Sequence, residues 1–231
     1  MVYLIPLSLT AFGAYYFDIK KNKRVQIVKS TSLPAGMINT DDIQVFDTDI
    51  QNNQISNESE ENNMYSTGKH HAEIVVKNYG TIALELDSDV APITVENFAN
   101  LVNEGFYNGL TFHRIISGFM IQGGDPLGNG TGGSSKTIKG EFASNGVKNS
   151  ISHVRGTISM ARSSMPNSAS SQFFIVHQDS TFLDGKYAAF GTVTSGMEVV
   201  DKICADTAVE DDNGTVAKNN QPVIEKITII D

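Results

Sequence analysis

The stretch Thr111–Pro126, TFHRIISGFMIQGGDP, decides the fold and indicates a binding function. It has the pattern of two short strands joined by a bend at Gly118 and followed by a glycine-rich exit. Most of its side chains are apolar, yet His113, Arg114 and Gln122 stand among them. Polar groups in such a strand must be hydrogen-bonded or open to a cleft. The pattern therefore predicts a groove where a cationic Arg beside an apolar shelf holds an uncharged ligand and polarises one of its bonds.

The composition is typical of a soluble globular protein and argues against several function classes. The chain has 231 residues, 40% of them hydrophobic, and a net charge of −9. This acidity, with no basic patch to offset it, argues against nucleic acid as a partner. The one cysteine, Cys204, excludes an internal disulfide framework, and its amphipathic surroundings predict a small buried side chain rather than a nucleophile.

No metal or cofactor is expected from the motifs. CxxC, HExxH and EF-hand patterns are absent from the sequence. The run GNGTGG at 128–133 resembles a phosphate loop, but the Lys-Ser/Thr pair and the amphipathic helix that should follow it are missing. We interpret this run as a flexible loop.

Residues 1–68 are predicted to be an N-terminal extension with two parts. Residues 2–17 are nearly all apolar or small and precede four basic residues. Three interpretations stay open: a β-rich or extended arm that packs on its own domain or a neighbouring subunit, a signal or membrane anchor, or disorder. Residues 38–68, rich in Asn and acidic side chains, are predicted to be a solvated linker. An arm would favour a homo-oligomer and an anchor would tether the protein, so its location stays open between intracellular and tethered.

Residues 69–231 are predicted to form one mainly β domain. Two alternating runs around a turn at 79–80 indicate a hairpin, and amphipathic patterns at 91–107 and 194–206 predict two helices. Short strand-like segments between turns occupy most of the remainder, up to a last strand at 226–230. This pattern is typical of an antiparallel sheet closed into a barrel with helices at its ends.

Three segments stand out because each mixes apolar and aromatic side chains with polar ones. They are FHRIISGFMIQGGDP at 112–126, GTISMARSSMPNSASSQFFI at 156–175 and FLDGKYAAFG at 182–191. With these motifs in this order, the chain resembles the cyclophilin family of peptidyl-prolyl cis-trans isomerases. The motifs look most similar to those of bacterial-type members. The resemblance covers about residues 69–231 and leaves 1–68 outside. It implies a closed eight-stranded antiparallel β-barrel capped by two α-helices, with a surface groove for proline-containing peptides or unfolded proteins.

The resemblance also implies roles for individual residues. Arg114 matches the family's catalytic arginine, His113 stands beside it, and Gln122 completes the catalytic set. The matched substrate-binding residues are Phe119, Met120, Ala161, Arg162, Gln172, Phe174, Phe182, Leu183 and Tyr187. Because rotation about the imide bond needs no covalent chemistry, an Arg that hydrogen-bonds to the proline nitrogen is sufficient to accelerate it. The resemblance calls for no metal and no cofactor.

Several positions depart from the pattern of many eukaryotic members. Phe182 stands where those members have a tryptophan whose N–H helps to bind cyclosporin, so weak cyclosporin binding is expected. Tyr187 replaces a histidine at the rim, a change that bacterial-type members share. Arg162 replaces an asparagine, and the loop after it, Ser163–Pro166, is longer, which would narrow the groove or change the residue accepted before proline.

The sequence is compatible with two functions. The intact set around Arg114 favours an isomerase that assists protein folding. The altered loop and the N-terminal arm favour a catalytically weak module that binds proline peptides or assembles with itself. We predict the isomerase.

Overall fold

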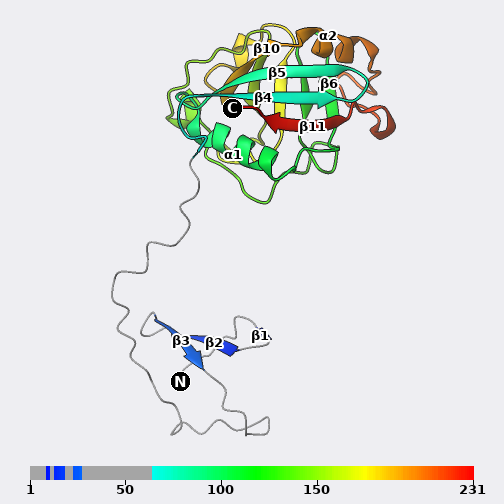
Figure 1. Ribbon diagram of the computed structural model, residues 1–231. Coiled ribbons are helices and arrows are strands. Elements are labelled where there is room, and N and C mark those ends of the chain that lie inside the picture. Colours follow the sequence, from blue (N-terminus) through cyan, green and yellow to red (C-terminus); the bar gives the residue numbers. More distant parts are fainter. Residues whose placement is uncertain (1–8, 11–12, 19–22, 28–63) are drawn as a thin grey trace, which may run out of the picture. The chain divides into compact units, whose positions relative to one another are not determined.

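The structure is a computed structural model, and it describes residues 9–10, 13–18, 23–27 and 64–231, drawn in colour in Figure 1. Among these residues, no helix is long and apolar enough to cross a membrane. The chain divides into two compact units.

The first unit, Met1–Ser56, contains a small antiparallel sheet of three strands in the order β1-β2-β3. Its strands are β1 (Leu9–Thr10), β2 (Gly13–Asp18) and β3 (Lys23–Ile27). The predicted arm, residues 2–17, is therefore described only in part, and its role as arm, signal or anchor stays a prediction. Most of the predicted linker, residues 38–68, lies outside the described residues.

The second unit, Asn57–Asp231, contains one eight-stranded antiparallel sheet and two α-helices. The strands are β4 (Lys69–Val76), β5 (Gly80–Asp87), β6 (Phe112–Ile116), β7 (Met120–Gly123), β8 (Thr157–Met160), β9 (Phe173–Val176), β10 (Ala189–Ser195) and β11 (Ile224–Ile229). The α-helices are α1 (Pro92–Asn103) and α2 (Met197–Asp206). Short 3₁₀ helices are η2 (Ala143–Asn145), η3 (Thr181–Leu183) and η4 (Lys218–Asn220).

The sheet is strongly curled, in the strand order β11-β4-β5-β10-β8-β9-β7-β6. Its two outer strands meet where Thr111 and Val223 form an antiparallel bridge. Beside this bridge the Phe112 amide donates to the Pro222 carbonyl at 2.9 Å. The predicted eight-stranded antiparallel fold with two helices is confirmed, and α1 and α2 lie at opposite ends of the curl (Figure 1).

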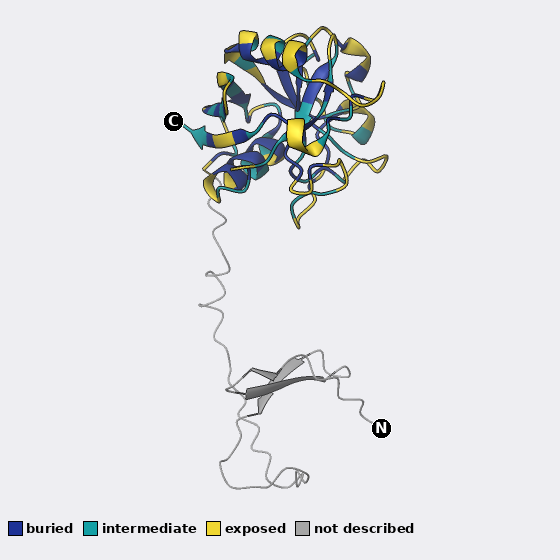
Figure 2. Cartoon of the chain, turned by 90° about the vertical axis from the view of Figure 1, so that its right-hand side faces the viewer, coloured by how far each residue is buried: buried dark blue, intermediate teal, exposed yellow. Residues whose placement is uncertain are grey.

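The hairpin of β4 and β5 shows why the sheet has a buried inner face. Ala72, Ile74 and Val76 alternate with more exposed residues along β4, and their side chains are fully or almost fully buried. The same alternation continues along β5, so one face of both strands contributes to the core. Figure 2 shows this division, with dark blue strands inside and yellow loops and helix faces outside.

Helix α1 packs its apolar side against this core. Pro92 stands in its first turn, where a missing N–H costs nothing. Phe98 is fully buried, and its ring centroid lies 5.2 Å from that of Tyr107, 5.6 Å from Phe173 and 5.3 Å from Phe190. This aromatic cluster joins the helix to β10 and to β9, which carries Phe174 of the candidate site.

Cys204 lies on the buried side of α2, as predicted. Burial raises the pKa of its thiol to about 11, so the thiol stays protonated and unreactive at neutral pH.

Candidate active site

The hairpin of β6 and β7 carries the polar centre of the site. Arg114 and Gln122 are paired across the two strands, and Gly118 with φ +81° forms the predicted bend between them. Cross-strand partners share one face of a sheet, so the two side chains meet. Arg114 Nη1 donates to Gln122 Oε1 at 3.2 Å, and Gln122 Nε2 donates to Gln172 Oε1 at 2.9 Å. Sequence analysis predicted all three polar residues, and the structure brings them together.

A fourth residue, Asn213, fixes the other side of the guanidinium. Arg114 Nε donates to the Asn213 carbonyl at 2.8 Å, and Nη2 donates to its Oδ1 at 3.1 Å. Burial lowers the pKa of Arg114 from its ordinary value, but an arginine remains a cation in proteins. Sequence reasoning missed Asn213, which lies 99 residues away in a polar turn that carries no apolar pattern.

Beside Arg114 lies a small apolar cluster separate from the main core. Its buried members are Met120, Phe174, Val176 and Leu183, and Ile116, Phe119, Ala161 and Tyr187 pack against them. The cluster thus collects most of the predicted substrate-binding residues from four separate stretches of chain. Phe182 is 62% exposed, and its ring lies 5.6 Å from that of Phe119 at the edge of the cluster.

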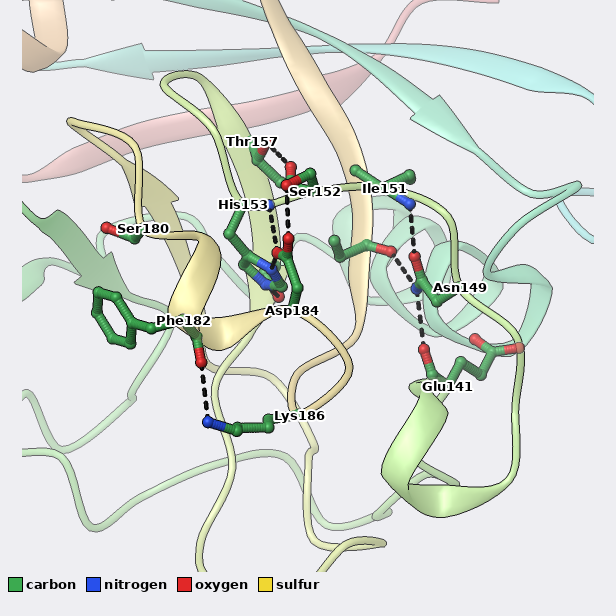
Figure 3. Close-up of polar contacts among 12 residues, drawn as sticks. Glu141, Asn149, Ile151, Ser152, His153, Thr157, Ser180, Phe182, Asp184 and Lys186 are labelled. Carbon is green, nitrogen blue, oxygen red and sulfur yellow. Dashed lines mark hydrogen bonds and ion pairs between the residues drawn. The ribbon is translucent and has the colours of Figure 1, made fainter.

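A polar network supports the Phe174 wall of this cluster. The buried ring of His153 stacks on Phe174, with centroids 6.0 Å apart. Its Nδ1 lies 2.8 Å from Asp184 Oδ1 (Figure 3). Its Nε2 lies 3.0 Å from Ser159 Oγ. Burial lowers the pKa of His153 although Asp184 opposes the change, so the ring is neutral at neutral pH. Sequence reasoning missed His153, because a lone His in a loop gives no signal of the strand it packs against.

Arg162 lies beyond the Tyr187 rim of the cluster. The backbone of the preceding residue is tied to the strand, because the Ala161 amide donates to the Gln172 carbonyl at 2.9 Å. The guanidinium carbon of Arg162 lies 4.8 Å from the Tyr187 ring centroid. Its side chain therefore packs behind the rim.

A polar cavity of about 760 Å³ lies on another side of Arg114. It is lined by His113, Arg114 and Gln122 together with loop residues including Asn129 and Glu210. His113 is only 4% exposed, and within the described residues neither of its ring nitrogens has a hydrogen-bond partner. Burial lowers the pKa of His113 although the charge of Asp125 opposes the change, and Arg114 adds a smaller decrease. The ring is therefore neutral and does not repel the neighbouring guanidinium.

Candidate metal ligands do not gather at this site. Within residues 64–231 and the three short N-terminal strands, no group of three or more His, Cys, Asp or Glu side chains could hold an ion. The groups that the site does bring together are a held guanidinium, polar amides and an apolar cluster.

Comparison with known proteins identifies the domain. The family model described as cyclophilin type peptidyl-prolyl cis-trans isomerase/CLD matches residues 71–230. The chain belongs to this family. Its activity is that of a peptidyl-prolyl cis-trans isomerase. This result confirms both the predicted enzyme and the resemblance to cyclophilins.

Bacterial cyclophilins are among its relatives. The chain is 51% identical over 128 residues to a peptidyl-prolyl cis-trans isomerase of Helicobacter pylori, covering 54% of this chain and 76% of the relative. It is 50% identical over 117 residues to peptidyl-prolyl cis-trans isomerase B of Bacillus subtilis, covering 51% of this chain and 78% of the relative.

A solved cyclophilin structure confirms the fold. The crystal structure of a cyclophilin-type isomerase from Cryptosporidium parvum, determined in the presence of the dipeptide Ala-Pro, superposes with a TM-score of 0.62. It is 32% identical in sequence and covers 70% of this chain and 99% of the other.

Proposed function

We propose that this cyclophilin domain binds X-Pro peptides in the groove beside Arg114. We further propose that Arg114 accelerates rotation about the imide bond by hydrogen bonding to the proline nitrogen, and that the protein thereby assists folding. The observation that carries the proposal is a partly buried guanidinium, held by Gln122 and Asn213, at the edge of an apolar cluster.

The chemistry requires only that the twisted bond be stabilised. The imide bond rotates over a barrier of about 18–20 kcal/mol, because its C–N bond has partial double-bond character. As the bond twists, the nitrogen gains lone-pair character and becomes a hydrogen-bond acceptor. A guanidinium that is already partly removed from water donates to it more effectively than a solvated one. Arg114 therefore binds the twisted state better than either planar state.

The apolar cluster supplies a place for the proline ring. Met120, Phe174 and Leu183 belong to one apolar cluster, and Met120 joins it to Arg114, whose Nη1 lies 3.9 Å from Met120 Sδ. Phe119 and Phe182 form an aromatic edge over the same region. A ring gripped here is held still while the rest of the peptide turns.

The two glutamines fix the polar side of the groove. Because Gln122 Oε1 accepts from Arg114, its Nε2 must donate, and it does so to Gln172. Gln172 Nε2 in turn donates to the Gly132 carbonyl at 2.7 Å. This chain of donors orients both amides, which we propose contact the substrate backbone. Because His113 is neutral, it places no second positive charge next to Arg114.

The decisive experiment is exchange NMR on an Ala-Pro peptide with wild-type protein, Arg114→Ala and Arg114→Lys. We expect Arg114→Ala to lower kcat/KM by about two orders of magnitude, the usual cost of removing one preorganised donor. Arg114→Lys keeps the positive charge but loses the planar guanidinium whose N–H groups donate to Gln122 and Asn213. We therefore expect it to restore little activity.

Two results would contradict the proposal. Activity retained in Arg114→Ala would remove Arg114 from the mechanism. Exchange at the uncatalysed rate with wild-type protein would favour a module that binds proline peptides without turning them over.

A further inference from the structure

Arg162 makes four hydrogen bonds to backbone carbonyls on two different segments. Its Nε and Nη2 donate to the Lys186 carbonyl at 3.0 and 2.8 Å. Its Nη1 donates to the Ser163 carbonyl at 2.8 Å and to the Ser164 carbonyl at 3.3 Å. The guanidinium thus forms its hydrogen bonds within the protein, and they connect the loop after β8 to the turn after η3.

Two aromatic rings pack on the same guanidinium. Its carbon lies 4.9 Å from the Phe142 centroid and 4.8 Å from the Tyr187 centroid. Each is close enough for a cation–π interaction. Tyr187 meets Phe174 edge-on with centroids 5.9 Å apart, so Arg162 stands directly behind a wall of the proposed proline pocket.

The loop held by Arg162 has a defined internal structure. Ser168 Oγ accepts a hydrogen bond from the Ser163 amide at 3.0 Å and donates to the Met165 carbonyl at 2.7 Å. Asn167 Oδ1 accepts from the Gly140 amide at 3.2 Å and from Asn145 Nδ2 at 2.8 Å. The loop therefore has little freedom, yet the Met165 side chain on it is 69% exposed.

Lys186 connects this loop to the other wall of the groove. Its amide donates to the Leu183 carbonyl at 3.0 Å, and its Nζ donates to the Phe182 carbonyl at 3.0 Å (Figure 3). Leu183 belongs to the apolar cluster, and Ala161, which directly follows β8, packs against it. Arg162 thus joins two segments that both border the groove.

We propose that Arg162 is a positioning residue for the part of the substrate that precedes the X-Pro pair. It holds loop Ser163–Ser168 so that Met165 forms an apolar contact for these residues. The inference rests on the proposed function. It adds that the peptide lies along Ala161, which packs against the apolar cluster, with the residues before the X-Pro pair directed toward Arg162. A peptide continuing past Ala161 reaches the loop, because Arg162 and Ser163 follow directly in the chain.

The test compares two peptides with the same core. One begins at Ala-Pro, and the other carries three additional apolar residues before it. The quantity measured is the ratio of kcat/KM for the long peptide to that for the short one. We expect Arg162→Ala to lower this ratio about tenfold, mainly through KM, because the loop binds planar and twisted states alike.

Two further variants separate positioning from charge and from folding. Arg162→Lys keeps the positive charge but cannot hold carbonyls on both segments, so we expect the ratio to fall as in Arg162→Ala. Ser168→Ala removes hydrogen bonds only within the exposed loop, and we expect a decrease of about threefold. If Arg162→Ala fails to fold, Ser168→Ala and Met165→Ser carry the test.

The ratio and the Met165 methyl signal test the two proposals separately. The role of Arg162 would be overturned if the ratio of the two kcat/KM values were unchanged in all variants. A variant that slows both peptides equally leaves the ratio unchanged and therefore also counts against this role. The Met165 methyl NMR signal of wild-type protein should shift on adding the long peptide and not the short one. This signal tests the contact even if turnover is absent, so failure of the proposed mechanism would not be mistaken for failure of this inference.

Discussion

Nδ1 of His177 accepts a hydrogen bond from the Gly118 backbone amide at 2.8 Å. The ring hydrogen is therefore on the other nitrogen, Nε2, which lies 3.0 Å from Asp201 Oδ1. The His177 amide also donates to the Phe119 carbonyl at 2.8 Å. The bend that carries Phe119 is thus linked through His177 to helix α2.

His177→Phe should loosen this bend without unfolding the protein. The Gly118 amide loses its acceptor but can bond to water, so the cost in stability should be about 1 kcal/mol or less. Because Phe119 edges the proline pocket, we expect KM for an Ala-Pro peptide to rise about three- to tenfold with little change in kcat. Asp201→Asn is the matched control, since its amide oxygen still accepts from Nε2, and it should stay near wild type. An unaltered KM in His177→Phe would show that the link does not position Phe119.

Stability should decrease as the pH falls below about 6.5. The pKa values of His113 and His153 are both lowered in the folded protein, mainly by burial. The unfolded chain therefore takes up protons first, and stability is complete above the ordinary value of 6.5 and is lost as the pH falls toward the folded-state pKa values. Each group contributes a slope of up to about 1.4 kcal/mol per pH unit in this window.

Urea unfolding at a series of pH values from 7.5 to about 4.5 measures this decline. His113→Phe should flatten it, because the titrating ring is replaced by an apolar ring of similar shape. The carboxyls of Asp125 and Asp184 also have lowered pKa values. Their contribution to stability is therefore lost only at lower pH, when the pH falls below the ordinary carboxyl pKa of 3.8. A decline equally steep in His113→Phe would assign the effect to other groups.

Gly124 should be essential to the packing of the hairpin against β9. It has φ +82°, and a Cβ there would lie 2.5 Å from the Ser171 carbonyl oxygen. Gly124→Ala should therefore cost about 2–5 kcal/mol of unfolding free energy, from backbone strain plus a collision with backbone. Gly146→Ala is the matched control, because Gly146 has φ +76° but no atom within 4 Å of the added Cβ. It should cost only about 1–2 kcal/mol. Equal costs by urea unfolding would exclude the collision as the cause.

The sequence allowed the fold and the hairpin at the centre of the site to be predicted for a physical reason. Arg114 and Gln122 stand on one hairpin, where the strand period itself brings them to the same face. The partners that hold them come from distant turns. Asn213 reaches Arg114 from 99 residues away, and nothing in its polar surroundings indicates that contact. His153 likewise supports Phe174 only because the loop before β8 folds beneath it. Local patterns specify strands, whereas loop positions follow from tertiary packing.

Phe182→Trp should strengthen cyclosporin binding. The Phe182 ring is exposed at the edge of the proposed pocket, beside Phe119, so an indole can be accommodated there without a buried collision. Phenylalanine offers no donor, whereas the indole N–H can bond to a carbonyl of the cyclic peptide. One such bond is worth about 0.5–1.5 kcal/mol, which corresponds to an affinity gain of roughly two- to tenfold. Phe182→Leu controls for the loss of the aromatic edge and should not bind more tightly than wild type. Titration calorimetry would settle the point: wild-type protein binding as tightly as Phe182→Trp would mean that the missing donor does not limit the affinity.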